Sequence, residues 1–482
     1  MISAALFLLT VSTAGLSGIE GLPPPAQPRP LQIPEAHEST LENGLHVVVI
    51  ERPGLPLVSA ELVVRSGAEG DPPSLAGLTS MTASLLTQGT TTRSATEIAQ
   101  QVEALGASLS AEAGWDSTHV ELTTLAAHVV PAFERLADVV RRPVFAPGEI
   151  DRLRRQELDD LRLALEEPAE VAPAAARRLA LGDSPYAHPI DGTLASLPRL
   201  TRKEIVARHA RTFVPSNAVL VIAGTLTAAE GRGLAERFFA DWQGPAPATP
   251  ATPATPAATP APPPPRAVLI DFPDADQAVV CVARAGLPGT HPDFLTGEVA
   301  NALLGGGYSS RLNQEIRVKR GLSYGAWSTL TGTRGSGLFA AGCQTKNESA
   351  AEVVAVIREE IERLGATLAP PDYFASRLAV LRGDFARTLE TNAGHVGAAA
   401  ECAALGRPLP TLATRVAAIE AVAADQVRAF AAAHLAAPTL SVVVIGRARL
   451  IEPALRPLLP SLTVIPQTQL DLDHPSLSSR PR

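Results

Sequence analysis

The chain is poor in cysteine, and its few cysteines do not pair in any familiar pattern. They number three, an odd count, and stand far apart at Cys281, Cys343 and Cys402. This spacing excludes a disulfide framework and a CxxC metal knuckle. Free cysteines are among the residues most often found in protein cores. We therefore expect three buried free thiols.

The chain also lacks an excess of positive charge. Its net charge is −8, and it contains 46% hydrophobic and 19% charged residues. The negative balance gives no electrostatic reason to expect nucleic acid or an anionic membrane as a partner. The composition is ordinary for a soluble globular protein. A length of 482 residues allows two to four domains, each with its own core.

No apolar run is long enough for a confident membrane span, and the nearest candidate is the N-terminus. Residues 4–9 are apolar and are followed by the small residues Ser12, Thr13 and Ala14. This pattern resembles the hydrophobic region and cleavage site of a secretory signal peptide, although the positively charged start is missing. At about 15 residues the segment is too short to span a bilayer. We expect residues 1–18 to be a signal peptide and the mature protein to be exported, to a bacterial periplasm.

A proline-rich tract divides the chain into two similar halves. Residues 244–265 read GPAPATPATPATPAATPAPPPP, which cannot pack a core and is typical of a semi-rigid polyproline-II spacer. On either side, residues 200–224 align without a gap on residues 422–446. Strand and helix patterns recur in the same order in both halves, which predicts a duplicated α+β domain. The predicted segments are a proline-rich lead-in 19–37, a first domain 38–243, the linker 244–265, a second domain 266–465 and a tail 466–482.

Within the first half, alternating and β-branched runs predict strands and 3.6-residue periodicity predicts helices. A capping box at Ser94 and Glu97 marks one helix start. The predicted strands include 107–113, 118–125 and a strand ending at Gly224, and the predicted helices include 75–87, 94–106 and 147–167.

The second half contains a stretch that stands out, LLGGGYSSRLNQEIRVKRGLSYGAWS, from Leu303 to Ser328. It holds the glycine triplet Gly305, Gly306 and Gly307, and an arginine and a tyrosine seven residues apart, Arg317 and Tyr324. A glycine triplet permits backbone at positive φ and the close approach of another chain. The simpler interpretation is a helix C-cap followed by a turn. A phosphate loop is excluded because no Gly-Lys-Ser/Thr follows.

Taken whole, this stretch resembles the second-half signature of the pitrilysin/insulinase family of zinc peptidases, which includes mitochondrial processing peptidase. The resemblance covers roughly residues 38–465. It implies an α+β fold of two homologous α/β-sandwich halves of the processing-peptidase type, joined by a linker and facing each other like a clamshell.

Catalytic members of the family carry an inverted zinc motif, HxxEH, in the first half. Two histidines four residues apart lie on one helix face and bind zinc, and the glutamate is the general base. The flanking Gly-Leu and Gly-Thr pairs of the family phrase align without a gap on residues 77–78 and 89–90. This places Ser80 and Ser84 at the histidine positions, Ala83 at the general-base position and Asp160 at a distal ligand position. Serine does not hold a catalytic zinc and alanine cannot accept a proton, so we expect no metal on this chain.

Other catalytic groups are not evident. Six of the ten histidines have no second histidine or carboxylate at ligand spacing on a shared helical face: His119, His128, His188, His209, His395 and His434. His188 lies in a loop, SPYAHPIDGT, where a hydrogen-bonding role is the simpler interpretation. A serine hydrolase is disfavoured because no G-x-S-x-G elbow with matching Asp and His is present.

The resemblance therefore implies the zinc-free subunit of a heterodimeric metallopeptidase. Zinc is then expected on a homologous partner subunit, while this chain supplies substrate contacts through Arg317, Tyr324 and residues 305–307. Arg317 and Tyr324 match a family pair suited to hold a peptide carbonyl. The structural alternative is that Arg317 caps a helix and Tyr324 fills core. The functional alternatives are a non-enzymatic scaffold of the same fold and, less well supported by the ligand count, a peptidase with a different metal arrangement.

Overall fold

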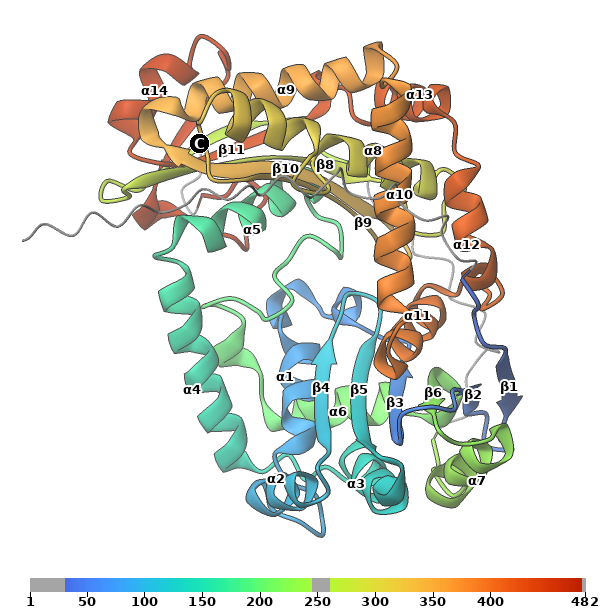
Figure 1. The fold of residues 1–482 in the computed structure, drawn as a ribbon. Helices are drawn as coiled ribbons and strands as arrows, with labels where there is room; N and C mark the ends of the chain where they lie inside the picture. The colour runs from blue at the N-terminus through green and yellow to red at the C-terminus, as the bar shows by residue number, and fades with distance from the viewer. Residues whose placement is uncertain (1–30, 245–260, 479–482) are drawn as a thin grey trace, which may run out of the picture. The chain divides into compact units, whose positions relative to one another are not determined.

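Figure 1 shows the computed structural model of the chain, in which residues 31–244 and 261–478 are described. The chain divides into two units, Met1–Gln32 and Ile33–Arg482, and the second unit contains both β-sheets. The predicted signal peptide, residues 1–18, lies outside the described residues, as do residues 19–30 of the lead-in, 245–260 of the linker and 479–482 of the tail. Within the described ranges, no helix is both long enough and apolar enough to cross a bilayer.

The first half is built on a six-stranded mixed sheet with the order β1-β2-β6-β3-β5-β4. Strands β2 and β6 are parallel, and the other neighbours are antiparallel. Burial alternates along β5, because its side chains point in turn to the helix-covered core and to the other face. The strands are β1 Ala36–Thr40, β2 His46–Glu51, β3 Leu57–Val64, β4 Ser108–Ala113, β5 Thr118–Leu125 and β6 Ala218–Gly224.

Helices cover the core face of this sheet, and two differ from the sequence prediction. The helix expected at 75–87 is shorter, because Gly77 adopts φ 92° at its N-cap and short 3-10 turns flank it on both sides. The helix expected at 147–167 ends at Ala164. The predicted capping box of Ser94 and Glu97 is present. The helices are α1 Leu78–Ser84, α2 Ala95–Ala104, α3 Val129–Arg141, α4 Pro147–Ala164, α6 Arg202–Thr212 and α7 Ala228–Phe239.

The second half repeats this topology in the order β12-β7-β11-β8-β10-β9. Five strands correspond to those of the first sheet, and only the edge strand differs, since β12 comes from the C-terminal end and pairs parallel with β7. The predicted α+β fold of two similar, clamshell-type halves is confirmed. The strands are β7 Ala267–Asp271, β8 Gln277–Gly286, β9 Ala326–Gly332, β10 Gly337–Lys346, β11 Ser441–Gly446 and β12 Thr463–Pro466.

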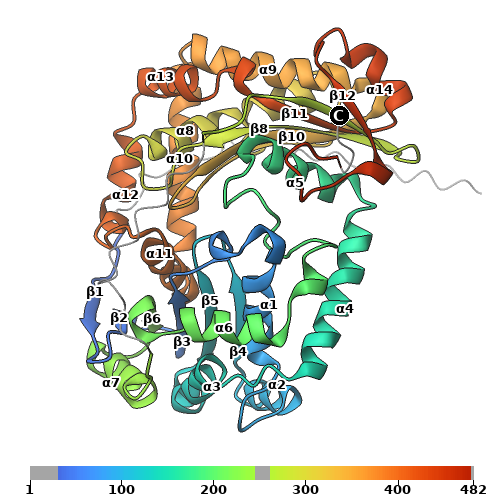
Figure 2. The same ribbon diagram turned by 180° about the vertical axis from the view of Figure 1, so that it is seen from behind.

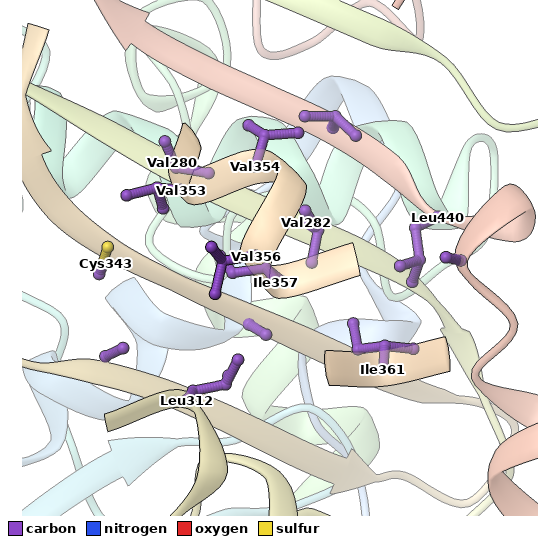
Figure 3. Packing of buried hydrophobic residues seen from close by; sticks show 14 of the residues in the cluster. Val280, Val282, Leu312, Cys343, Val353, Val354, Val356, Ile357, Ile361 and Leu440 are labelled. Carbon is purple, nitrogen blue, oxygen red and sulfur yellow. The ribbon is translucent and has the colours of Figure 1, made fainter. Parts of the chain in front are cut away.

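The core of the second half lies between its sheet and the long helix α9. Figure 3 shows Val353 and Ile357 of α9 beside Val280 and Val282 of β8, all fully or nearly fully buried. Close packing of branched side chains at helical spacing fixes α9 across the sheet. The helices are α8 Phe294–Leu304, α9 Ala350–Ala366, α10 Pro371–Thr388, α11 Asn392–Leu405, α12 Thr411–Glu420, α13 Ala424–His434 and α14 Ala448–Leu455.

Each half also contributes one helix to the sheet of the other half. Helix α5, Pro168–Leu181, follows α4 in the chain but packs on β8, β10 and β11 of the second sheet (Figures 1 and 2). Helix α11 belongs to the second half and packs on β3 and β6 of the first sheet. Both helices present alanines at the contact, which lets their backbones approach the strands closely. The two halves therefore share packing and cannot be separated without exposing both sheets.

A polar cluster adds a second link between the halves at the turn between β9 and β10. The Arg334 Nη2 atom donates to Glu69 Oε1 at 2.8 Å, and the Arg334 backbone N donates to Asp116 Oδ2 at 2.7 Å. The Tyr186 hydroxyl donates to the other oxygen of Asp116 at 2.8 Å. Burial raises the pKa of Glu69 to about 7, although the Arg334 cation opposes the shift.

This raised pKa predicts a pH dependence of stability. A carboxyl whose folded pKa lies above its unfolded value stabilises the fold fully below the unfolded pKa, here 4.5. That stabilisation is lost as the pH rises through about 7. Between about pH 5 and about pH 8 the unfolding free energy of the wild type should fall as Glu69 ionises. In Glu69→Gln this fall should be smaller by about 2 kcal/mol. Urea unfolding across this range measures it, with the exposed Glu236→Gln as control, and equal pH slopes would refute it.

Candidate functional site

Arg317 lies between two exposed tyrosines in the glycine-rich region of the second half. Its guanidinium carbon is 4.9 Å from the ring centre of Tyr308 and 4.5 Å from that of Tyr324. The two tyrosines are 64% and 88% exposed. A cation over an aromatic face is attracted by the ring quadrupole, so the two rings hold the guanidinium plane in place. We call these three residues the Tyr-Arg-Tyr stack.

The hydrogen-bonding capacity of this stack is free. Within residues 31–244 and 261–478, no hydrogen bond or ion pair to the Arg317 guanidinium is recorded, and its nitrogen atoms are not buried. Five N–H donors in a planar fork are therefore available to a carbonyl or carboxylate group. The alternative in which Tyr324 fills core is wrong, because this side chain is 88% exposed.

The backbone around Arg317 is held in an unusual conformation. Arg317 lies in a π-helical segment, Asn313–Lys319, a form that often occurs at functional sites. Asn313 fixes the start of the segment by donating to the Gly307 carbonyl at 3.1 Å and accepting from the Ala326 backbone N at 2.9 Å. Glu315 anchors its buried side through ion pairs with Lys319 at 2.5 Å and Arg320 at 2.6 Å. Arg317 is thus directed to the surface by contacts that do not use it.

The three glycines differ in what surrounds them. Gly305 caps α8, and its carbonyl accepts from the Ser328 backbone N at 3.2 Å, where a Cβ on Gly305 would come within 2.3 Å of that nitrogen. A Cβ on Gly306 would lie 2.9 Å from the Ala302 Cα. Gly307 has φ +153°, and its nearest neighbour would be Arg377 Nη1 at 3.9 Å. The first two glycines are needed by the chain's own backbone and only the third borders open space, so their contact with substrate stays a prediction.

The positions that correspond to the zinc motif lie on α1. Ser80 Oγ donates to Asp191 Oδ1 at 2.8 Å, and Ala83 is fully buried. Ser84 offers a neutral hydroxyl, and Asp160 is exposed on α4. Neutral hydroxyls and a methyl group do not match the imidazole and carboxylate donors that zinc requires, so these residues do not fit the metal. Across the described parts of the chain, no three His, Cys, Asp or Glu side chains gather closely enough to hold a metal ion.

A carboxylate that the sequence comparison did not select lies close to this degenerate site. Glu157, one helical turn before Asp160 on α4, is half-buried. Burial raises its pKa, and the negative charges of Asp191 and Asp160 raise it further. The helical periodicity of α4 was the signal that could have identified it, because residues three apart share a face.

We expect the purified chain to hold no stoichiometric zinc and to cleave no peptide alone, since Ser80, Ala83 and Ser84 supply neither ligands nor a general base. Elemental analysis and a peptide-cleavage assay check this. One tightly held zinc per chain, lost in Asp160→Ala, would contradict it.

A serine, a histidine and a glutamate line up elsewhere in the order of a hydrolytic triad. Ser117 Oγ is 2.7 Å from His119 Nε2, and His119 Nδ1 is 2.5 Å from Glu61 Oε1. Sequence analysis missed this group because it is formed across strands β3 and β5. Ser117 is only 3% exposed, so a substrate carbonyl cannot reach its hydroxyl. The cluster is a buried hydrogen-bond network, which agrees with the rejection of a serine hydrolase.

Two further sequence predictions can be compared with the structure. Cys281, Cys343 and Cys402 are free and buried, as predicted. His188 is 5% exposed, and its Nε2 atom lies 3.1 Å from the Ala68 carbonyl oxygen. The predicted hydrogen-bonding role of His188 is confirmed.

Two family models match the chain, one within the first half and one that runs from the end of the first half into the second. The model described as insulinase, peptidase family M16, matches residues 46–193. The model described as the peptidase M16 inactive domain matches residues 199–378 and so includes the Tyr-Arg-Tyr stack.

Individual proteins agree with these models. An uncharacterised zinc protease of Streptomyces coelicolor is 25% identical over 412 residues, covering 84% of this chain and 88% of its own length. An uncharacterised zinc protease of Mycobacterium leprae is 28% identical over 325 residues, covering 67% and 72%. The crystal structure of a peptidase M16 inactive domain from Pseudomonas fluorescens superimposes with a TM-score of 0.78 at 26% identity, covering 86% of this chain and 98% of that chain.

Proposed function

Because the chain belongs to the insulinase family, peptidase family M16, we propose that it is the zinc-free subunit of a heterodimeric metallopeptidase. In this proposal a homologous partner carries HxxEH and zinc, and the two subunits together hydrolyse peptides. This chain contributes substrate contacts and no metal chemistry. The proposal includes export of the mature chain, in keeping with its N-terminal sequence.

One contrast carries the proposal. The first half has no donors for zinc at Ser80, Ala83 and Ser84, whereas the second half holds a half-buried arginine, Arg317, between two exposed tyrosine rings. An exposed arginine normally samples many rotamers and forms ion pairs with nearby carboxylates. Arg317 is instead held by two aromatic rings, and Glu315 two residues away pairs with other cations. A guanidinium that is held in place before binding, and has no carboxylate of its own chain to pair with, is suited to bind an acceptor group of a substrate.

The chemistry of the stack fits a peptide carbonyl. The Arg317 fork can donate to a carbonyl oxygen and stabilise negative charge as it develops there. The Tyr324 hydroxyl, 88% exposed, can donate a second hydrogen bond to the same group. Both groups act by binding and orientation, so their effect requires a partner that supplies the reacting water.

The decisive experiment is reconstitution with an HxxEH-bearing homologue encoded in the same genome. We expect the two chains to form a stable complex and the mixture to hydrolyse unstructured peptides that neither chain cleaves alone. Size-exclusion chromatography with light scattering measures assembly, and a quenched-fluorescence peptide library measures cleavage.

A scaffold role would give a different outcome. A stable complex whose partner is equally active with and without this chain would refute the catalytic contribution. It would make the non-enzymatic binding protein of the same fold the better description.

A further inference from the structure

A second candidate binding site lies where helix α5 meets the second sheet, on the face of the sheet opposite to α9. A cavity of about 540 Å³ opens there, a size typical of sites for small ligands or single side chains. Two of the three tryptophans of the chain, Trp115 and Trp327, line it. Leu338, Ala340 and Ile190 extend the apolar wall.

One cation lies in this apolar wall. The guanidinium carbon of Arg177, on α5, is 4.9 Å from the ring centre of Trp115, and Nη1 donates to the Tyr186 carbonyl at 3.3 Å. Among the described residues, no carboxylate within ion-pair distance of Arg177 is recorded, and its remaining nitrogens are not buried. Burial lowers the pKa of Arg177 to about 10, with no opposing shift from an anion.

An unpaired cation in an apolar cavity is costly unless something compensates it. Some partly buried arginines of this chain are paired with carboxylates, for example Arg334 with Glu69 and Asp116, whereas others, such as Arg178, bind only backbone carbonyl oxygens. Arg177 has no ion-pair partner among the described residues, and it contacts the Trp115 ring and a backbone carbonyl, which leaves its other nitrogen atoms accessible from the cavity. An anion that matches a planar fork of donors would pair with Arg177, and a carboxylate has this geometry.

The rim of the cavity adds a polar requirement. Thr329 and Thr331 of the edge strand β9 line it and are exposed. The Thr331 hydroxyl donates to the Leu338 carbonyl at 3.3 Å, whereas the Thr329 hydroxyl has no hydrogen-bond partner within residues 31–244 and 261–478. The Thr329 hydroxyl suits a ligand with an amide group next to its carboxylate, which a fatty acid does not offer.

We propose that this cavity binds the C-terminal residue of a peptide, with the carboxylate on Arg177 and an apolar side chain between Trp115 and Trp327. The choice of a peptide rests on the proposed function, whereas the carboxylate and the apolar side chain follow from the cavity itself. Peptide hydrolysis generates C-terminal carboxylates, so the site would hold a cleavage product or the end of a substrate. It shares no lining residue with the Tyr-Arg-Tyr stack.

The test uses the purified full-length chain without a partner and two forms of one peptide, Ac-Ala-Ala-Phe with a free carboxylate and the same peptide as the C-terminal amide. Because two of three tryptophans line the cavity, binding should change tryptophan fluorescence, and calorimetry provides an independent affinity. We expect the acid to bind at least about tenfold more tightly than the amide, as for one charge-assisted hydrogen bond. Equal affinities, or no binding of either form, would overturn the proposal.

Two variants test whether Arg177 is the group that binds the carboxylate. Arg177→Gln should reduce affinity for the acid to the level of the amide, while Arg162→Gln, an exposed arginine on α4, should leave both affinities unchanged. If Arg177→Gln does not fold, the comparison of acid and amide on the wild-type chain still decides. Octanoate is the lipid-like probe, and binding of octanoate as tight as that of the peptide acid would refute a peptide ligand. Because no partner subunit is involved, failure of this test is distinguishable from failure of the heterodimer.

Discussion

In a reconstituted complex with the zinc-bearing partner, Arg317→Ala lowers kcat about 10²-fold, the loss typical of removing one oxyanion donor. The reason is that the Arg317 guanidinium offers a planar fork of donors, stacked between two tyrosine rings and without an ion-pair partner in the described parts of the chain. An interaction that strengthens as negative charge develops on the carbonyl oxygen changes kcat, whereas a uniform binding contact changes KM. Steady-state kinetics on one defined peptide measures the two parameters separately.

Tyr324→Phe separates the two roles of the tyrosine. The phenyl ring keeps the contact with the Arg317 cation, and only the hydroxyl is lost. A fall in kcat similar to that of Arg317→Ala would assign a hydrogen bond to the hydroxyl. Heterodimer formation and the zinc content of the partner should be unchanged in both variants.

Val318→Ala is the matched control for Arg317→Ala, since Val318 is 54% exposed in the same π-helical segment. It reports whether local disturbance of the segment is enough to lower activity. Full turnover of both the Arg317 and Tyr324 variants in a correctly assembled complex would mean that the pair is structural here. A non-enzymatic scaffold would then be the better description of this chain.

The sequence predicted the fold because the duplication repeats its local signals. Residues 200–224 and 422–446 align without a gap, and they form α6 with β6 and α13 with β11 at corresponding positions. Alternating burial on strands and helical periodicity recur in both halves, so each half supports the interpretation of the other. Arg317 and Tyr324 were found through a motif, and their proximity in space comes from the structure, where Tyr324 follows the π-helical segment and places its ring 4.5 Å from the guanidinium carbon.

The residues that sequence analysis missed are those whose partners are distant in the chain. Helix α5 was not predicted as a separate element, because Pro173 interrupts its pattern and its apolar face matches a sheet in the other half. Arg177 on this helix gave no signal, since neither Trp115 nor Trp327 is near it in sequence. Tyr308 follows the glycines directly, yet only the fold places its ring over Arg317. Local patterns cannot report contacts made across such separations.

The exchange of α5 and α11 predicts that the two halves unfold together. Leu179 of α5 is 1% exposed and packs in the cluster that includes Cys281 and Val443 of the second sheet. Leu179→Ala should lower the unfolding free energy by about 2–5 kcal/mol, because the substitution leaves a cavity in close-packed core. Leu163→Ala on α4 is the matched control, since this leucine is 69% exposed and should change stability by less than about 0.5 kcal/mol.

The number of transitions tests the exchange itself. Although Leu179 lies in the first half of the chain, its removal weakens the core of the second sheet, and α11 in turn covers the first sheet. Circular dichroism, which reports on all helices, and the fluorescence of Trp242, buried in the first half, should therefore shift to lower denaturant by the same amount. Following Trp242 alone requires Trp115 and Trp327 to be replaced by phenylalanine in both proteins. Two separate transitions, with only one displaced by Leu179→Ala, would mean that the exchanged helices do not couple the halves, and that each sheet keeps its fold without the helix contributed by the other.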